Sequence, residues 1–149
     1  DPFFSMRNYL LNGHTEIFGA EIGTLIYGAG KGIIRSFQEF DLCAEPYMKH
    51  PKNTIYYFGD LDYEGIGIYE NLAEKFRSRW KIIPFVPAYQ TMLGKAEQIT
   101  ELPETKEHQN RNISTQFFSC FDEIMVKKME TVLEKDRYIP QEILNTADF

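Results

Sequence analysis

The sequence predicts an α/β domain in which parallel strands are joined by crossover helices. Two apolar runs rich in β-branched and aromatic residues, Thr54–Phe58 and Lys81–Val86, flank a segment whose apolar residues recur at helical spacing. A third run, Ile22–Tyr27, stands before a glycine turn and another helical pattern. Strands that alternate with helices in this order are typical of a parallel sheet, because each helix carries the chain back to the edge where the next strand starts.

The elements of the first third follow from their ends and their periodicity. Pro2–Leu11 is expected to form a short helix, since proline fits a helix start and Gly13 stands just beyond the end. We expect Ile22–Tyr27 to be a buried strand and Gly28–Gly32 to be a tight turn. The helix after the turn has apolar residues at helical spacing, at Ile33, Ile34, Phe37 and Phe40.

The middle of the chain continues the pattern. After the strand Thr54–Phe58, a helix is predicted at about Ile66–Ser78, with basic residues near its C-terminal end. Lys81–Val86 is the next predicted strand. Tyr89–Gln98 has the pattern of a short helix, and the polar stretch Leu102–Asn112 is expected to be an exposed loop.

A long C-terminal amphipathic helix is predicted from about Ser114 onward. Its apolar stripe is expected to face the sheet, as such stripes usually do. The stripe consists of Phe117, Phe118, Phe121, Ile124, Met125, Met129, Val132 and Leu133.

Composition limits the class of protein. A chain of 149 residues with 43% apolar and 26% charged residues has the size of one domain, which we assign to residues 1–149. The net charge of −6 disfavours a surface that holds nucleic acid by itself, because such binding depends on Lys and Arg. The apolar runs are far shorter than the roughly 18 residues of a membrane helix, so we expect a cytoplasmic protein without membrane contact. Cys43 and Cys120 form neither a disulfide framework nor a zinc pattern.

An acidic cluster, Asp60, Asp62 and Glu64, follows the strand Thr54–Phe58. On extended backbone the side chains of Asp60 and Asp62 point to the same side, where they can share one hydrated Mg²⁺. Ligands of open α/β sheets also bind at the C-terminal ends of the strands. Glu64 is either a third oxygen ligand or a charge that favours the N-terminus of the next helix. Alternatively, the three acids only cap that helix and solvate the turn.

Two other motifs fit this cluster in part. An EF-hand loop would use Asp60, Asp62 and Glu64 together with Gly65, but its twelfth position is Asn71 and a strand precedes it. A haloacid-dehalogenase-like phosphatase also carries Asp-x-Asp after a buried strand, with Asp60 as nucleophile and Asp62 as acid/base. That pattern continues with Thr or Val where this sequence has Glu64, and its strand is expected near the start of the domain.

Three segments together resemble the Toprim fold of topoisomerases, primases and several nucleases. They are Tyr27–Lys31 (YGAGK), Tyr57–Gly65 (YFGDLDYEG) and Ile139–Ile143 (IPQEI). More narrowly, they are similar to the C-terminal Toprim domain of the Wadjet plasmid-defence nuclease subunit, which is related to the A subunit of type VI topoisomerase. The resemblance covers about Asp1–Leu144, and the Asp-x-Asp block is its specific part.

This resemblance implies a Toprim-like, Rossmann-like parallel sheet flanked by helices, in a metal-dependent DNA nuclease. Asp60 and Asp62 would hold Mg²⁺ or Mn²⁺ for phosphodiester hydrolysis, and Glu64 is the candidate to hold a second ion. A Toprim site also uses a glutamate at the end of its first strand. Since the chain begins with Asp1 rather than Met, that strand is expected upstream in a longer protein. The implied partners are DNA, held by basic regions outside this fragment, other subunits of a defence complex, and a second copy of the chain.

The glycine turn supplies candidates for substrate contacts. Gly28 and Gly30 permit a close approach of the backbone to a ligand, and Lys31 can reach a phosphate. A P-loop is excluded, because its pattern would need Gly in place of Leu25 and Ser or Thr in place of Gly32.

Further polar residues are expected to be exposed rather than functional, although Glu142 is a candidate for one more acid. The others are Arg35, His14, His50 and His108. Two alternatives to a nuclease stay open: a phosphatase of the haloacid-dehalogenase type, and a non-catalytic Toprim-like scaffold in a DNA-processing complex.

Overall fold

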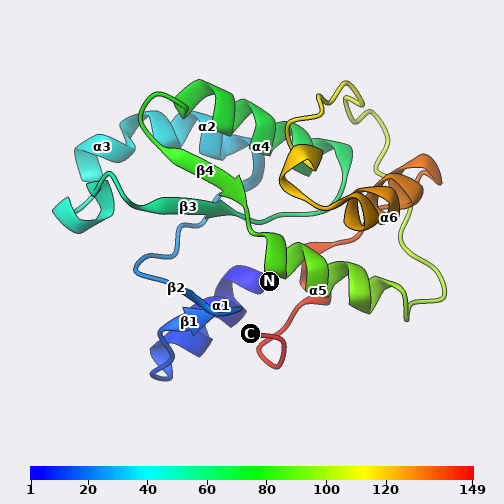
Figure 1. Ribbon diagram of the computed structural model, residues 1–149, viewed down its shortest axis with the longest axis horizontal. Helices are drawn as coiled ribbons and strands as arrows, with labels where there is room; N and C mark the ends of the chain where they lie inside the picture. Colours follow the sequence, from blue (N-terminus) through cyan, green and yellow to red (C-terminus); the bar gives the residue numbers. More distant parts are fainter.

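The computed structural model describes residues 1–149 as a mixed α/β chain. Its centre is a strand–helix–strand unit made of β3 (Thr54–Tyr57), α4 (Tyr63–Phe76) and β4 (Lys81–Pro84) (Figure 1). The two strands pair in parallel, with Thr54 opposite Lys81 and Tyr57 opposite Pro84. The predicted α/β class, with parallel strands and a crossover helix, is therefore confirmed.

The predicted strand at Ile22–Tyr27 is wrong, and the parallel sheet has two strands. The segment makes one backbone hydrogen bond, from the Ile22 N–H to the Thr15 carbonyl at 2.9 Å. The side chains of Ile26 and Tyr27 are 40% and 58% exposed rather than buried. An apolar run becomes a strand only where a neighbouring strand offers ladder partners, and none lies beside this one.

A short hairpin precedes that segment and was not predicted. β1 (Glu16–Ile17) and β2 (Ala20–Glu21) pair antiparallel. The two turn residues, Phe18 and Gly19, have φ angles of 51° and 76°. Positive φ at both central positions is the geometry of a two-residue hairpin turn.

The helices agree with the sequence in position more than in length. α1 (Pro2–Leu11) begins and ends as predicted. The region after the glycine turn is broken into short pieces, α2 (Ile33–Ser36) and α3 (Phe40–Cys43), linked by a 3₁₀ turn. α5 (Val86–Ala96) starts before the predicted Tyr89, because β4 already ends at Pro84.

The long helix predicted from Ser114 is also wrong at its start, since α6 spans Glu123–Glu134. The Asp122 carboxylate caps this helix by accepting a hydrogen bond from the Met125 N–H at 2.8 Å. Further back, a 3₁₀ turn at Phe118–Cys120 is followed by Phe121 in an extended conformation, with φ of −118° and ψ of 159°, which separates this segment from α6. The aromatic residues of the predicted stripe thus reach the core from a turn.

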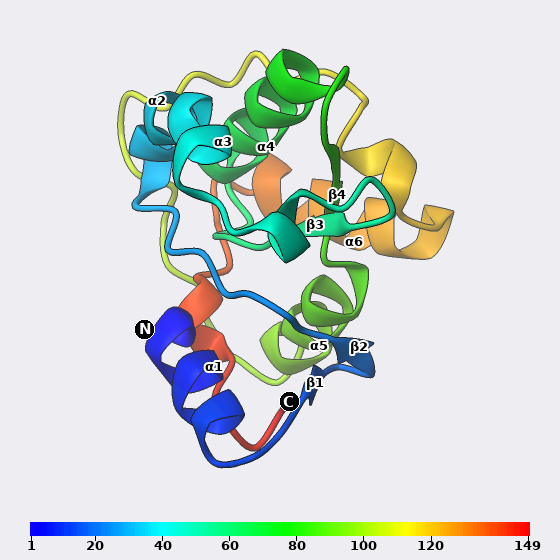
Figure 2. The ribbon, with the colours of Figure 1, turned by 90° about the vertical axis from the view of Figure 1, so that its left-hand side faces the viewer.

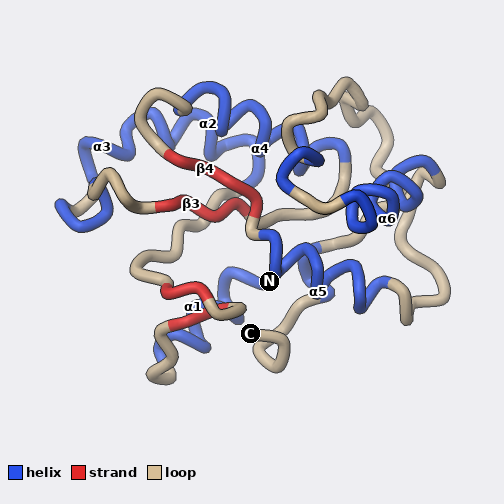
Figure 3. The backbone as a smooth tube through the Cα atoms, in the orientation of Figure 1, coloured by secondary structure: helices blue, strands red, loops and turns tan.

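The helices lie on opposite sides of the two parallel strands. α2 and α4 are on one side, whereas α1, the hairpin and α5 are on the other (Figures 1 and 2). Figure 3 shows how much of the chain between these elements is loop, including the long connection from α5 to α6. One buried cluster joins both sides, and its fully enclosed members include Leu61, Ile66, Tyr89, Met92, Phe117, Met129 and Ile139. None of the helices is both long and apolar enough to cross a membrane.

Candidate functional site

The acidic block follows β3 and leads directly into α4. Leu61, between the two aspartates, is fully buried, and its backbone forms an isolated antiparallel bridge with Ile139. The Leu61 N–H donates to the Ile139 carbonyl at 2.9 Å, and the Ile139 N–H donates back at 3.2 Å. Because successive side chains of extended backbone alternate in direction, those of Asp60 and Asp62 point to the side opposite the buried Leu61 side chain. The C-terminal segment therefore holds the acidic block in place.

Asp62 is the one charged residue that is buried, with 3% of its surface exposed. Its Oδ1 accepts a hydrogen bond from the Gly65 N–H at 2.6 Å, which makes Asp62 the N-cap of α4. Its Oδ2 accepts a hydrogen bond from Nε2 of Gln109 at 2.7 Å. Each carboxylate oxygen has two acceptor sites, so one remains free on each for a cation.

Asp60 is half-buried beside Asp62. Its Oδ1 accepts a hydrogen bond from the Gln141 N–H at 2.9 Å, and its Oδ2 makes none. Burial raises the pKa of the Asp60 carboxyl above its ordinary value, and the charge of Asp62 raises it further. The Gln141 N–H and the cation of Lys106 act in the opposite direction. A divalent cation beside the pair would offset both the cost of burying the two negative charges and the repulsion between them.

Glu64 lies in the first turn of α4 and forms an ion pair with Lys31, with Nζ 3.0 Å from Oε2. This contact brings the glycine turn against the N-terminus of the helix. Ala29 and Gly30, with φ angles of 51° and 64°, make the tight turn that points Lys31 there. The structure thus joins Lys31 to the acidic cluster, as a contact of Glu64.

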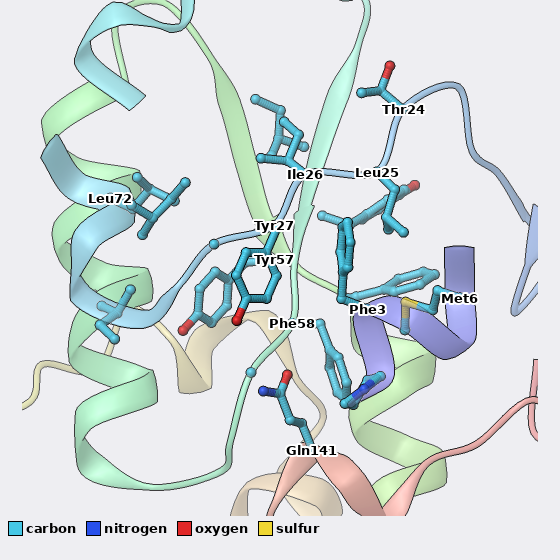
Figure 4. Close-up of a pocket in the computed structure, with 18 of the residues that line it drawn as sticks. Phe3, Met6, Thr24, Leu25, Ile26, Tyr27, Tyr57, Phe58, Leu72 and Gln141 are labelled. Atoms are coloured by element: carbon cyan, nitrogen blue, oxygen red, sulfur yellow. The ribbon is translucent and has the colours of Figure 1, made fainter. Parts of the chain in front are cut away.

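A groove of about 840 Å³ runs beside β3 and reaches the acidic cluster. Figure 4 shows its walls, which come from α1, the extended segment before the glycine turn, β3 and α4. Five of the residues predicted for the site, Gly28, Gly30, Asp60, Asp62 and Glu64, line this groove. Its remaining charged residues are Asp1, Glu21, Lys52, Lys106 and Glu142.

The acids are not gathered into a complete metal site. No group of three or more His, Cys, Asp or Glu side chains in this chain is arranged to hold an ion. Asp60 and Asp62 fit a hydrated divalent cation, because both keep free acceptor sites and both line the groove. Glu64 is engaged by Lys31, and Glu142 is exposed at the rim. The histidines at 14, 50 and 108 are exposed, as is Arg35.

Two contacts of the acidic block have no signal in the sequence. Gln109 reaches Asp62 from 47 residues away, out of a polar loop. Lys106, from the same loop, lines the groove near Asp60. A nearer residue, Tyr57, donates its hydroxyl to the Gly65 carbonyl at 2.8 Å, and burial raises the pKa of that phenol. Side chains of this kind are recognised only when the fold brings them together.

Comparison with protein-family models, with curated proteins and with solved structures finds no match to this chain.

Proposed function

We propose that this chain is a Toprim-like catalytic domain of a metal-dependent DNA endonuclease, in which Asp60 and Asp62 bind Mg²⁺ or Mn²⁺. The observation that carries the proposal is the buried Asp62 beside a half-buried Asp60 at the end of β3. Burial of two neighbouring carboxylates is unfavourable without an opposing charge, and perturbed acids in a groove mark functional sites. The role in a plasmid-defence complex belongs to the same proposal, with DNA held by basic regions outside this chain.

In this proposal some residues of the chain bind the metal ion and others contact the phosphate groups of DNA. A bound divalent cation neutralises charge on a phosphodiester and lowers the pKa of a coordinated water. Oδ2 of Asp60 and the free acceptor sites of Asp62 would hold the cation. Lys106, which lines the groove near Asp60, and Lys31, which pairs with Glu64, would contact phosphate oxygens.

A further strand beside β3 would complete this domain. The Tyr57 carbonyl accepts from the Phe85 N–H at 2.7 Å, so the polar backbone groups of Tyr57 face β4. In a parallel ladder the groups of the adjacent residues, Tyr56 and Phe58, then face the open edge. The groove at this edge has the apolar walls that a buried strand needs. A strand inserted there would end near Asp60, where it would supply the glutamate that the Toprim resemblance implies.

The scaffold alternative has one observation in its favour. Asp62 is hydrogen-bonded at both oxygens, at 2.6 and 2.7 Å, and so has a structural role as a helix cap without any metal. If no cation binds, the half-buried charge of Asp60 would lower the stability of the fold without serving a function. The two functions differ in whether a cation binds at these residues.

The test is nicking of supercoiled circular DNA in Mn²⁺ by the chain, alone and together with the other subunits of the proposed defence complex. Asp60→Asn and Asp62→Asn are expected to abolish nicking, whereas Asp122→Asn, a cap in another helix, leaves it intact. Equal nicking by all variants would contradict the proposal. Binding of Mn²⁺ without nicking, together with hydrolysis of p-nitrophenyl phosphate, would indicate the phosphatase; no Mn²⁺ binding at all would indicate the scaffold.

A further inference from the structure

We propose that Gln109 is a positioning residue of the Asp60–Asp62 site, an inference that rests on metal binding by this pair. Its Nε2 donates to Oδ2 of Asp62 at 2.7 Å, across 47 residues of chain. The other oxygen of Asp62 is fixed by the Gly65 N–H at 2.6 Å. One donor on each oxygen sets the plane of the carboxylate, and a metal bound there meets a ligand that is already oriented.

Asp136 contacts the loop that carries Gln109 at two points, one before Gln109 in the sequence and one after it. The Thr105 N–H donates to the Asp136 carbonyl at 2.8 Å. Nη2 of Arg111 lies 2.6 Å from Oδ1 of Asp136. Asp136 presents both groups from a left-handed backbone conformation, with φ of 55°. The position of Gln109 is therefore defined by contacts and does not depend on Asp62 alone.

A second attachment joins this loop to the start of α4. The Arg111 guanidinium lies over the ring of Tyr63, 5.2 Å from its centroid. Tyr63 directly follows Asp62, and its hydroxyl donates to the Leu133 carbonyl at 3.5 Å. The loop is thus attached to the residue next to Asp62, which supports the position of Gln109 beside that carboxylate.

The oxygen of the Gln109 side-chain amide indicates that the stability of the fold alone does not explain where this side chain lies. Oε1 of Gln109 is buried and has no hydrogen-bond partner. A buried oxygen without a donor is unfavourable for folding. The amide cannot be turned to relieve this, because Oε1 would then face the carboxylate of Asp62. A side chain that accepts this cost to hold Asp62 is typical of residues that orient a ligand group.

The test compares Gln109→Met with the same change at Gln98, an exposed glutamine in the turn that follows α5, Gln98→Met. Methionine keeps the volume of glutamine and removes the donor. Titration with Mn²⁺, followed by electron paramagnetic resonance, is expected to give a Kd raised about tenfold in Gln109→Met and unchanged in Gln98→Met.

Hydrogen exchange without metal tests the Gln109–Asp62 contact, and the Mn²⁺ titration separates this inference from the proposed function. In the unmodified chain the side-chain NH₂ of Gln109 is expected to be slow to exchange with water, and Asp62→Ala is expected to make it fast. If the unmodified chain binds no Mn²⁺, the proposed function fails and the positioning role fails with it. If it binds Mn²⁺ and Gln109→Met binds equally well, the positioning role alone is overturned. A lower melting temperature with unchanged Mn²⁺ affinity would likewise show a purely structural residue.

Discussion

Gly65 approaches Asp60 so closely that a Cβ built on it would lie 2.2 Å from the Asp60 carbonyl oxygen and 3.1 Å from Oδ1 of Asp62. The first turn of α4 therefore passes directly behind the acidic block. Only glycine allows this approach, which explains why it stands three residues after the second aspartate.

Replacing this glycine is expected to disrupt both helix start and acidic block. Gly65→Ala should lower the free energy of unfolding by about 2–4 kcal/mol, because the backbone contact has no room to relax. Gly67→Ala, in the same helix with open space around it, should instead raise it by about 0.5–1 kcal/mol. Urea unfolding measures both. Equal effects of the two substitutions would contradict the close approach.

The two aspartate caps offer a comparison between structure and function. Asp62→Ala and Asp122→Ala each remove an N-cap, worth about 1 kcal/mol. Asp62→Ala should cost about 1–2 kcal/mol more, since it also leaves the Gln109 amide unpaired. Thermal unfolding checks these values, and Mn²⁺ titration should show loss of binding for Asp62→Ala only. An equal loss of Mn²⁺ binding in both variants would mean that binding depends on the stability of the fold rather than on the Asp62 carboxylate.

Asp60 should make stability depend on pH. Its pKa is raised in the folded chain, so the folded state holds this proton more tightly than the unfolded state. Stability from this group is thus complete below the unfolded value of 3.8 and decreases as the pH rises through that value to the folded one. Asp60→Asn, which keeps an acceptor for the Gln141 N–H, should be more stable than the unmodified chain at pH 7.

This advantage should shrink as the pH falls through the raised folded pKa to the unfolded value of 3.8 and should stay constant below it, which urea unfolding across a pH series would show. The same variant should lose Mn²⁺ binding. An Asp60→Asn variant that is less stable at neutral pH would contradict an unfavourable charge at this position.

Glu70 is expected to control the end of the loop that carries Gln109. Its carboxylate accepts hydrogen bonds from the Ser114 N–H and hydroxyl, both at 2.8 Å, and from the Phe117 N–H at 3.2 Å. Glu70→Ala should cost about 1–3 kcal/mol and speed exchange of these two backbone amides. Glu74→Ala, one turn later in an exposed ion pair with Arg77, should change stability by less than about 0.5 kcal/mol. Hydrogen exchange that is unaffected by Glu70→Ala would refute this anchor.

The sequence predicted those elements whose contacts are local. β3, α4 and β4 follow from apolar periodicity, a cap and a turn, all within 31 consecutive residues of one strand–helix–strand unit. Ile22–Tyr27 has an equally apolar pattern, but a strand also needs a neighbour, and no pattern within the run reveals whether one is present. The segment from Ser114 to Phe121 failed because Phe121 is extended, with φ of −118° and ψ of 159°, and Asp122 caps a new helix after it. The apolar spacing continues across this break and does not reveal it.

The candidate site divides in the same way. The Asp60–Asp62 pair could be found from spacing after a strand, and Lys31 from its place in the glycine turn. Gln109 and the Gln141 N–H could not, because they reach the acids only through tertiary contacts over 47 and 81 residues. Glu64, predicted as a ligand, is held by Lys31, a charge partner that spacing alone does not reveal.

The open edge of β3 has a consequence for the behaviour of the isolated chain at high concentration. Unpaired N–H and C=O groups beside exposed apolar side chains, among them Tyr56 at 42%, form a template on which another extended backbone can pair. Two molecules that meet edge to edge would give slow, concentration-dependent self-association. A lysine at this position, Tyr56→Lys, would act as a gatekeeper against such pairing and should keep the chain monomeric in light scattering.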